Sequence, residues 1–272
     1  MLGSACHATV SRCSVKTPLG RVLVRPSSMK KHTTASSISQ PRALVLLDRD
    51  GVINTDVGSP GVLTERDFTL VPGAAKAVAK LKRNGAVVCV VTNQTCVGKG
   101  LIDESRLDSI HAAMRALLAE QGGDDATIDD IFAATHTEDQ EQSRDGPERL
   151  KPAPGMVLEA LARHGFGANL GSVTFVGDTV TDMQAAYRAG VVNRITVGTG
   201  YGAEVYQALC DVIDECRQED ERDDELLLGK EVFIVNTTED DPSSTLAPET
   251  LPLTVCADIV QAVEVIVQGM RE

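Results

Sequence analysis

Short apolar runs alternate with amphipathic helical segments along most of this 272-residue chain. Each run is uniformly apolar, as expected of a strand buried on both faces of a sheet. The segments between the runs place apolar side chains three and four residues apart, on one face of a helix. This alternation predicts a doubly wound α/β fold, with a mostly parallel sheet and helices on both faces. The expected strands are 43–47, 86–91, 131–134, 173–176 and 194–197.

The chain has a different composition on either side of this pattern. Residues 1–42 form a basic extension, and the first 47 residues hold no Asp or Glu, which is typical of an organelle transit peptide. A disordered extension without function, or a true start at Met29, are the alternatives. Residues 43–272 are expected to form one domain with an acidic insertion at about 203–250, a composition usual for a solvated helix face or loop. Residues 232–235 and 253–267 are read as a further strand and as a closing strand and helix.

Charge, hydropathy and cysteine content exclude several kinds of protein. The formal net charge of −13 argues against a nucleic-acid partner, because phosphate contacts need clustered Lys and Arg. No apolar run approaches the ~20 residues that span a bilayer, so we expect no membrane role. The seven scattered cysteines include no C-x-x-C pair, which favours reduced thiols in an intracellular protein. We expect a monomer or small homo-oligomer in the cytoplasm, or in an organelle if the extension is a targeting peptide.

Two carboxylates, Asp48 and Asp50, follow directly on the first expected strand. In doubly wound folds, ligands bind beyond the carboxyl ends of the strands. Two like charges raise each other's pKa, a cost that a divalent cation removes, and hard oxygen ligands of this kind suit Mg²⁺. One carboxylate can then attack phosphorus while the other handles a proton. The alternative is that Gly51 and the aspartate before it merely turn the chain at the end of a strand.

The Asp48 motif does not stand alone. Four fragments resemble, in order, the signature motifs of the haloacid dehalogenase-like (HAD-like) hydrolase superfamily: 48–52, 92–93, 151–152 and 177–182. The resemblance implies a Rossmann-like fold and a Mg²⁺-dependent phosphatase that forms an aspartyl-phosphate on Asp48. Protonated Asp50 would act first as the general acid and then as the base. Thr92 would donate its hydroxyl to the phosphoryl group, and Lys151 would offset its negative charge. The metal would be bound by Asp48, by the main-chain carbonyl of Asp50 and by Asp178.

From about residue 43 to residue 202, the motifs are similar to those of heptose-bisphosphate and histidinol-phosphate phosphatases. This closer resemblance implies a small phosphorylated metabolite as substrate, of the sugar phosphate or histidinol-phosphate type. It also implies a set of substrate-binding residues, namely Asp56, Gly58, Ser59, Asn93, Gln94, Thr95 and Thr179.

Two departures from that subfamily bear on its chemistry. Its members commonly hold a structural zinc through three cysteines and a histidine, but the segment 134–150 contains His136 and no cysteine. We therefore expect no zinc and read His136 as an ordinary loop histidine. Leu150 stands where the heptose enzymes have an arginine. Loss of this bidentate phosphate donor weakens the case for the heptose bisphosphate as substrate.

The intervals between the motifs are too short for a large cap domain, so an open site is expected. Three other functions remain. A polynucleotide 3′-phosphatase could also lack a cap but should have a basic groove. A phosphotransferase would share every motif and differ in its acceptor. A non-catalytic scaffold could keep the fold, but it would have no use for a costly cluster of carboxylates.

Overall fold

A seven-stranded sheet organises the residues that the computed structural model describes, which are 43–141, 148–204, 206–207, 233–235 and 253–271. The strand order is β3-β2-β1-β4-β5-β7-β6, and every neighbouring pair is parallel except β6 with β7. This confirms the predicted doubly wound, mostly parallel sheet. The strands are β1 (Ala43–Leu47), β2 (Ala86–Asn93), β3 (Asp130–Ala134), β4 (Val173–Gly177), β5 (Asn193–Val197), β6 (Phe233–Val235) and β7 (Leu253–Cys256).

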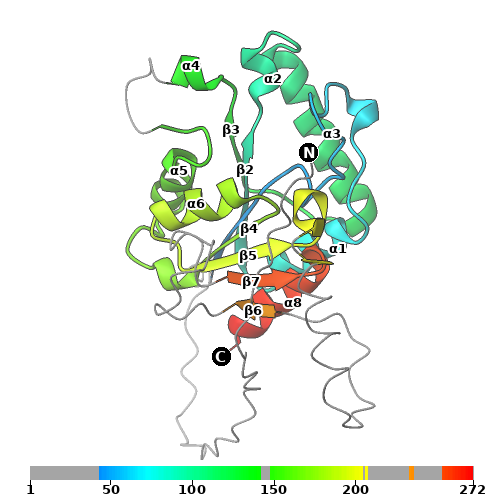
Figure 1. Cartoon of the computed structure of the whole chain (residues 1–272). Helices are drawn as coiled ribbons and strands as arrows, with labels where there is room; N and C mark the ends of the chain where they lie inside the picture. Colours follow the sequence, from blue (N-terminus) through cyan, green and yellow to red (C-terminus); the bar gives the residue numbers. More distant parts are fainter. Residues whose placement is uncertain (1–42, 142–147, 205, 208–232, 236–252, 272) are drawn as a thin grey trace, which may run out of the picture. The chain divides into compact units, whose positions relative to one another are not determined.

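Helices cover both faces of this sheet (Figure 1). Successive residues of β1 show why both faces are needed, because Val45 and Leu47 belong to one apolar cluster while Leu44 and Leu46 belong to another. The first cluster includes residues of α1, α3 and α8, and the second includes residues of α5 and α6. The helices are α1 (Ala74–Arg83), α2 (Thr95–Gly98), α3 (Glu104–Gly122), α4 (Glu138–Glu141), α5 (Gly155–His164), α6 (Val180–Arg188) and α8 (Ile259–Gly269).

Three of the described helices, α3, α6 and α8, begin with a side-chain cap that satisfies a free amide. The carboxylate of Asp103 accepts from the Arg106 amide at the start of α3, and Asp258 accepts from the Gln261 amide in α8. At α6, Thr179 and Asp182 form a reciprocal capping box. The last of these caps matters for function, because α6 begins just after β4 at the carboxyl edge of the sheet.

The elements differ from the sequence-based expectations in a few places. Strand β2 continues to Asn93, so Thr92 and Asn93 end the strand instead of following it. The short helices α2 and α4 and the 3₁₀ turns η1 (Glu65–Asp67), η2 (Leu170–Ser172) and η3 (Gly200–Gly202) were not foreseen. The described chain holds no cap domain between β1 and β3. The basic extension 1–42 and most of the acidic segment 203–250 lie outside the described residues.

Two further findings concern the described residues. None of their helices combines the length and the hydrophobicity that crossing a bilayer requires. Their cysteines, Cys89, Cys96 and Cys256, are free buried thiols.

The central strand β1 should contribute strongly to stability, because its side chains are buried on both faces. Leu46 is 0% exposed and Leu101 is 49% exposed. We expect Leu46→Ala to lower the free energy of unfolding by about 2–5 kcal/mol, measured by urea denaturation. The control Leu101→Ala should change it by less than about 0.5 kcal/mol. Equal effects of the two substitutions would contradict this assignment of the core.

Candidate active site

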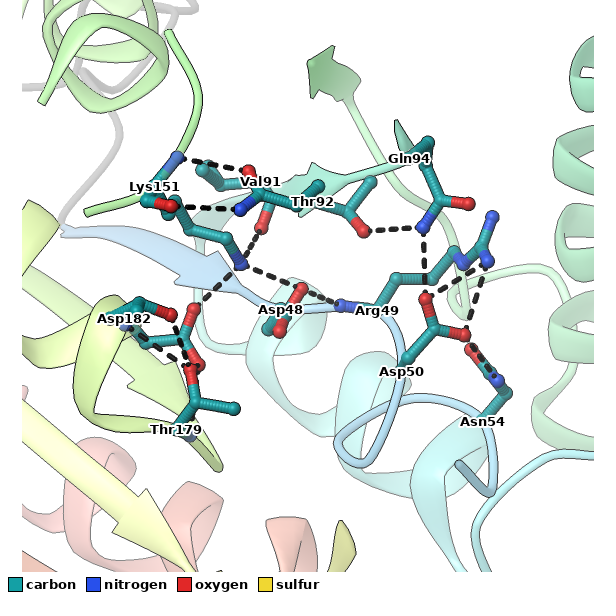
Figure 2. A network of polar contacts seen from close by, with 12 residues as sticks. Asp48, Arg49, Asp50, Asn54, Val91, Thr92, Gln94, Lys151, Thr179 and Asp182 are labelled. Atoms are coloured by element: carbon teal, nitrogen blue, oxygen red, sulfur yellow. Dashed lines mark hydrogen bonds and ion pairs between the residues drawn. The ribbon is translucent and has the colours of Figure 1, made fainter. Parts of the chain in front are cut away.

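The carboxyl ends of β2, β1 and β4 lie side by side, because these strands are neighbours in the sheet. Asp48 follows β1, Thr92 is the last residue but one of β2 and Asp178 follows β4. Parallel strands place these ends at one edge, so three polar side chains that are far apart in sequence meet there. Figure 2 shows the polar network that connects the first two of them to Lys151.

Lys151 is the cation at the centre of this network. Its ammonium donates to Asp182 Oδ1 at 2.6 Å, to Asp48 Oδ1 at 2.9 Å and to the Val91 carbonyl at 3.0 Å. Lys151 is only 5% exposed. Burial alone would lower the pKa of this amine, but Asp182 and Asp48 raise it above its ordinary value. Lys151 is therefore a permanent positive charge beside Asp48.

Asn93 fixes the main chain of Lys151. Its side-chain amide donates to the Lys151 carbonyl and its side-chain oxygen accepts from the Lys151 amide, both at 3.0 Å. The two residues are 58 positions apart, so this pair of bonds ties the end of β2 to the loop before α5. Asn93 was expected to touch substrate, and the structure gives both ends of its amide a protein partner instead.

Asp182 is a site residue that sequence reasoning did not assign. It is 0% exposed, and its two oxygens have separate tasks. Oδ1 accepts from Lys151, while Oδ2 accepts from the amide and the hydroxyl of Thr179 at 3.0 and 2.6 Å. Thr179, expected at the substrate, thus uses its hydroxyl to cap α6. The available signal was the spacing of Asp182 from Asp178 within the fourth motif.

The carboxylates at this edge fit a divalent cation. Ligand oxygens of Asp48, Asp178 and Asp182 lie within 4.8 Å of one another. Both oxygens of Asp182 already have partners, so Asp48 and Asp178 are the residues left to bind a metal. Asp178 Oδ1 is buried and has no hydrogen bond within the part of the chain that the structure describes, whereas Oδ2 accepts from the Tyr201 amide at 2.8 Å. A buried carboxylate oxygen without a partner is costly, and a hard cation would satisfy it.

The pKa values of these carboxyl groups show the electrostatic cost of the cluster. Burial and the charge of Asp182 raise the pKa of Asp48 to about 8, against the opposing effect of Lys151. Burial and Asp182 also raise the pKa of Asp178 to about 7, although the Tyr201 amide lowers it. Burial and nearby negative charges both favour the neutral acid, and a bound cation would favour the charged form instead.

Two glycines allow the chain to pass close to Asp178. A β-carbon on Gly51 would lie 2.2 Å from Asp178 Oδ2, and one on Gly200 would lie 2.1 Å from the same atom. Both residues also have positive φ angles, of 80° and 56°. The loop after β1 and the loop after β5 therefore meet at the carboxylate of Asp178.

The surroundings of Asp50 lower its pKa, whereas those of Asp48 and Asp178 raise theirs. The Arg49 guanidinium donates to both of its oxygens at 3.1 and 3.0 Å, and the side-chain amides of Asn54 and Gln94 each add a bond of 2.9 Å. Burial alone would raise the pKa of Asp50, but Arg49 and these bonds lower it below its ordinary value. In the free site Asp50 is therefore held as an anion, so the protonated form expected of a general acid would have to arise after the substrate binds.

Arg49 is itself held in place by residues that the motif does not contain. It is 0% exposed and lies 5.9 Å from the Phe68 ring centroid. Its Nη1 lies 3.4 Å from His111 Nε2 on α3. Burial and the charge of Arg49 lower the pKa of His111 to about 4, so the imidazole is neutral and accepts from the guanidinium. No sequence signal connected His111 with the loop after β1.

Gln94 connects Asp50 to Thr92 through hydrogen bonds from its side-chain amide. Its buried side-chain amide donates to Asp50 Oδ2 and, at 2.8 Å, to Thr92 Oγ1. Because the Thr92 hydroxyl accepts this bond, its own proton remains available for another acceptor. Gln94 was expected to bind substrate, and in this structure it positions two other residues.

Of the remaining expected substrate residues, Asp56, Gly58 and Ser59 lie in the loop between β1 and η1, and Thr95 begins α2. Asp56 and Gly58 line a cavity of about 590 Å³, and Asp56 Oδ1 accepts from the Gly58 amide at 3.0 Å. Ser59 and Thr95 are not among the residues that line it. The other lining residues are Gly51, Thr55, Val71, Pro72, Thr199, Gly200 and Tyr201.

His136 is not the ordinary loop histidine that the sequence suggested. It is buried and forms an ion-pair contact with Glu141 of α4. Glu141 Oε1 also accepts from the Arg149 amide and, at 3.4 Å, from the Leu150 amide. These contacts connect the segment after β3 to the residues just before Lys151.

A carboxylate beside a buried lysine, a second carboxylate held by an arginine and a cation site at the edge of a parallel sheet define an enzyme of metal-assisted phosphoryl transfer. A family model described as haloacid dehalogenase-like hydrolase matches residues 47–190, more than half of the chain. The chain belongs to this family.

Curated relatives and a solved structure agree with this assignment. The heptose-1,7-bisphosphate 7-phosphatase of Pseudomonas aeruginosa is 38% identical over 161 residues, 59% of this chain and 84% of the relative. A Mycobacterium tuberculosis enzyme of the same kind is 35% identical over 175 residues, 63% of this chain and 87% of the relative. The Bordetella bronchiseptica heptose-bisphosphate phosphatase, solved with magnesium and phosphate, has a TM-score of 0.59 at 28% identity. That match covers 84% of this chain and 99% of the solved chain. The protein is a phosphoric monoester hydrolase, and its metal is Mg²⁺.

Removal of the central cation should destabilise the fold in a pH-dependent way. Lys151→Met leaves Asp48 and Asp182 facing each other without a counterion, which should cost about 3–5 kcal/mol in unfolding free energy near pH 8. The loss should shrink toward pH 5, because the folded-state pKa of Asp48 exceeds the unfolded one and protonation of Asp48 relieves the repulsion. Urea denaturation at several pH values measures it.

Lys82→Met is the matched control for this prediction. Lys82 pairs with Asp129 in a partly exposed salt bridge of 2.6 Å, so its loss should cost at most about 1 kcal/mol at either pH. A Lys151→Met protein that is no less stable than this control would contradict the central role of the ammonium.

Magnesium should stabilise the protein more at pH 8 than at pH 6. The folded-state pKa of Asp48 is about 8 and that of Asp178 about 7, both above the unfolded value of 3.8. The metal-free protein therefore loses stability as the pH rises from about 4 to 8. Mg²⁺ competes with the protons of Asp48 and Asp178, so the stabilisation by Mg²⁺ grows as the pH rises toward 8. At a Mg²⁺ concentration of 100 times its Kd, this stabilisation should be about 2.7 kcal/mol.

Thermal melts with Mg²⁺ and with EDTA at the two pH values measure this difference. In Asp178→Asn the rise in Tm with Mg²⁺ should be lost. An equal rise at pH 6 and pH 8, or an undiminished rise in the variant, would show that the ion binds elsewhere.

Proposed function

We propose that this phosphatase cleaves the phosphate ester of a small sugar-like metabolite in two steps, through an aspartyl-phosphate on Asp48. The observation that carries the proposal is the state of the Asp48 carboxylate. Its Oδ1 accepts from Lys151 at 2.9 Å and from the Arg49 amide at 2.7 Å. Its Oδ2 has no hydrogen bond among the described residues. One oxygen is thus held while the other is open at the carboxyl edge of the sheet.

In the first step, Asp48 attacks phosphorus and the leaving alkoxide takes a proton. Lys151 opposes the added negative charge, and the free hydroxyl proton of Thr92 is directed to a phosphoryl oxygen. Asp50 begins as an anion, but the two charges of a bound phosphate raise its pKa, so that it takes up the proton which the leaving group needs. Asp48, Asp178 and the Asp50 carbonyl would hold Mg²⁺, which would offset the negative charge of the phosphoryl oxygens.

In the second step, Asp50 is the base. Having lost its proton, it is again stabilised as an anion by Arg49, Asn54 and Gln94. It can then take a proton from the water that attacks the phosphorus of the aspartyl-phosphate. Free phosphate leaves, and the Asp48 carboxylate returns to its bond with Lys151. The hydrogen bonds from Arg49, Asn54 and Gln94 thus favour the deprotonated form of Asp50, which is the base that hydrolysis needs.

The names of the relatives support the substrate class. The curated relatives act on heptose bisphosphates, and the cavity beside Asp178 is large enough for a small sugar. A polynucleotide substrate is less well supported, because the residues that line this cavity include no Lys or Arg.

The test is phosphate release from a panel of sugar phosphates, histidinol phosphate, nucleotides and a 3′-phosphorylated oligonucleotide, with Mg²⁺ and with EDTA. We expect release from sugar-type monoesters with Mg²⁺ alone and without an added acceptor, which separates a hydrolase from a transferase. Asp48→Asn should lower kcat by a factor on the order of 10⁴ or more, with an unchanged circular dichroism spectrum.

The control for that substitution is Asp124→Asn, the same chemical change at an exposed residue between α3 and β3. It should keep the wild-type rate. Turnover by Asp48→Asn above a tenth of the wild-type rate would rule out the aspartyl-phosphate on this residue.

A further inference from the structure

Three consecutive main-chain amides, up to and including that of Lys151, donate to side chains. The amides of Arg149 and Leu150 both donate to Glu141 Oε1, and the second of these bonds measures 3.4 Å. The Lys151 amide donates to Asn93 Oδ1 at 3.0 Å. Residues 149–151 belong to no helix or strand, so their amides need acceptors from elsewhere in the chain. Glu141 and Asn93 therefore hold the main chain that carries the ammonium.

Glu141 is a buried carboxylate whose two oxygens have different partners. The residue is 6% exposed. Oε1 faces the two amides, and Oε2 forms the ion-pair contact with His136 Nε2. A buried carboxylate is costly unless hydrogen bonds or charges compensate it, and here both oxygens are compensated. Glu141 thus connects the segment that follows β3 to the main chain just before Lys151.

Helix α4, which ends at Glu141, is itself held against the carboxyl edge of the sheet. Gln140 Oε1 accepts from the Thr137 amide at 3.0 Å, and Gln140 Nε2 donates to the Gly98 carbonyl at 3.3 Å. A β-carbon on Gly98 would lie only 2.9 Å from His136 Cα, so α2 passes close to the start of this segment. These contacts give Glu141 a defined position relative to the ends of β2 and β3.

The Lys151 ammonium has little freedom to move without losing its contacts. Nζ lies 2.6 Å from Asp182 Oδ1 and 2.9 Å from Asp48 Oδ1. The side chain of lysine is long and flexible, so these distances depend on where its main chain is held. A displacement of about 1 Å at a reacting centre can lower the rate by a factor of about 100. Residues that hold this main chain can therefore affect the rate without contacting the substrate.

We propose that Glu141, in contact with His136, is a positioning residue that places Lys151 by holding the amides of residues 149 and 150. The inference rests on the proposed function, in which Lys151 opposes the negative charge of Asp48 and of the phosphoryl group. Glu141 lies outside the four motifs and acts through the main chain. Loss of its carboxylate leaves every reacting group present and displaces the ammonium.

The test measures hydrolysis of para-nitrophenyl phosphate with Mg²⁺, because this probe requires no recognition of a sugar. In Glu141→Leu, kcat should fall at least about tenfold while KM changes less than about threefold, since the ammonium acts on charge that develops in the transition state. Glu141→Gln should keep kcat within about threefold of the wild type, because its side-chain oxygen still accepts from both amides.

Glu138→Leu is the matched control, because it makes the same change at an exposed position of the same helix. It should keep the wild-type kcat. Circular dichroism at the assay temperature establishes that each variant is folded. If Glu141 only stabilised the fold, folded Glu141→Leu would have the wild-type kcat, and this result would overturn the inference. A loss in Glu141→Gln as large as that in Glu141→Leu would overturn it as well.

Lys151→Met in the same assay separates the inference from the proposed function. Its kcat should fall at least about 100-fold, and a wild-type rate would contradict the role of Lys151 in the proposed function. If Glu141→Leu does not fold, Glu141→Asp takes its place, because it keeps a carboxylate but withdraws it from the two amides by one methylene. Its kcat should fall at least about fivefold, and an unchanged kcat would overturn the inference.

Discussion

The ammonium of Lys151 is the interaction on which the rest of this site depends. It lies between two buried carboxylates, and each belongs to a different part of the chain. Asp48 comes from the end of β1, and Asp182 comes from the first turn of α6. Without a cation, two negative charges at this depth could not coexist. The two hydrogen bonds between the Asn93 side chain and the main chain of Lys151 show that the end of β2 also helps to hold this lysine in place.

The two reacting carboxylates differ in their electrostatics although one residue separates them. Burial and like charges raise the pKa of Asp48, whereas Arg49 and two amides lower that of Asp50. Enzymes commonly shift the pKa values of two neighbouring acids in opposite directions so that the two can have different catalytic roles. Asp48 requires cations to become a nucleophile, and Asp50 is already an anion in the free protein. His111 and Phe68 stabilise this division indirectly, through their contacts with Arg49.

Much of the fold and the outline of the site could be predicted from the sequence, because buried parallel strands are apolar and their polar ends mark one edge of the sheet. Asp48, Thr92 and Asp178 were expected at that edge, and the structure brings them there. The orientation of Asn93, Gln94 and Thr179 could not be predicted, because a motif names residues without fixing where their side chains point. The same holds for the contact between His136 and Glu141, because the sequence pattern does not show that these two polar side chains are buried.

Asp182 has two roles, as the capping residue of α6 and as a counterion of Lys151. Fraying of the first turn of this helix would therefore release one of the two carboxylates that neutralise the lysine, without any change at the substrate. During evolution, substitutions at Thr179 would be constrained by the chemistry even though its hydroxyl faces the helix. An exposed residue of the same helix, such as Val180, would be free to vary. Helix α6 thus contains positions that are constrained by the active site and positions that are not.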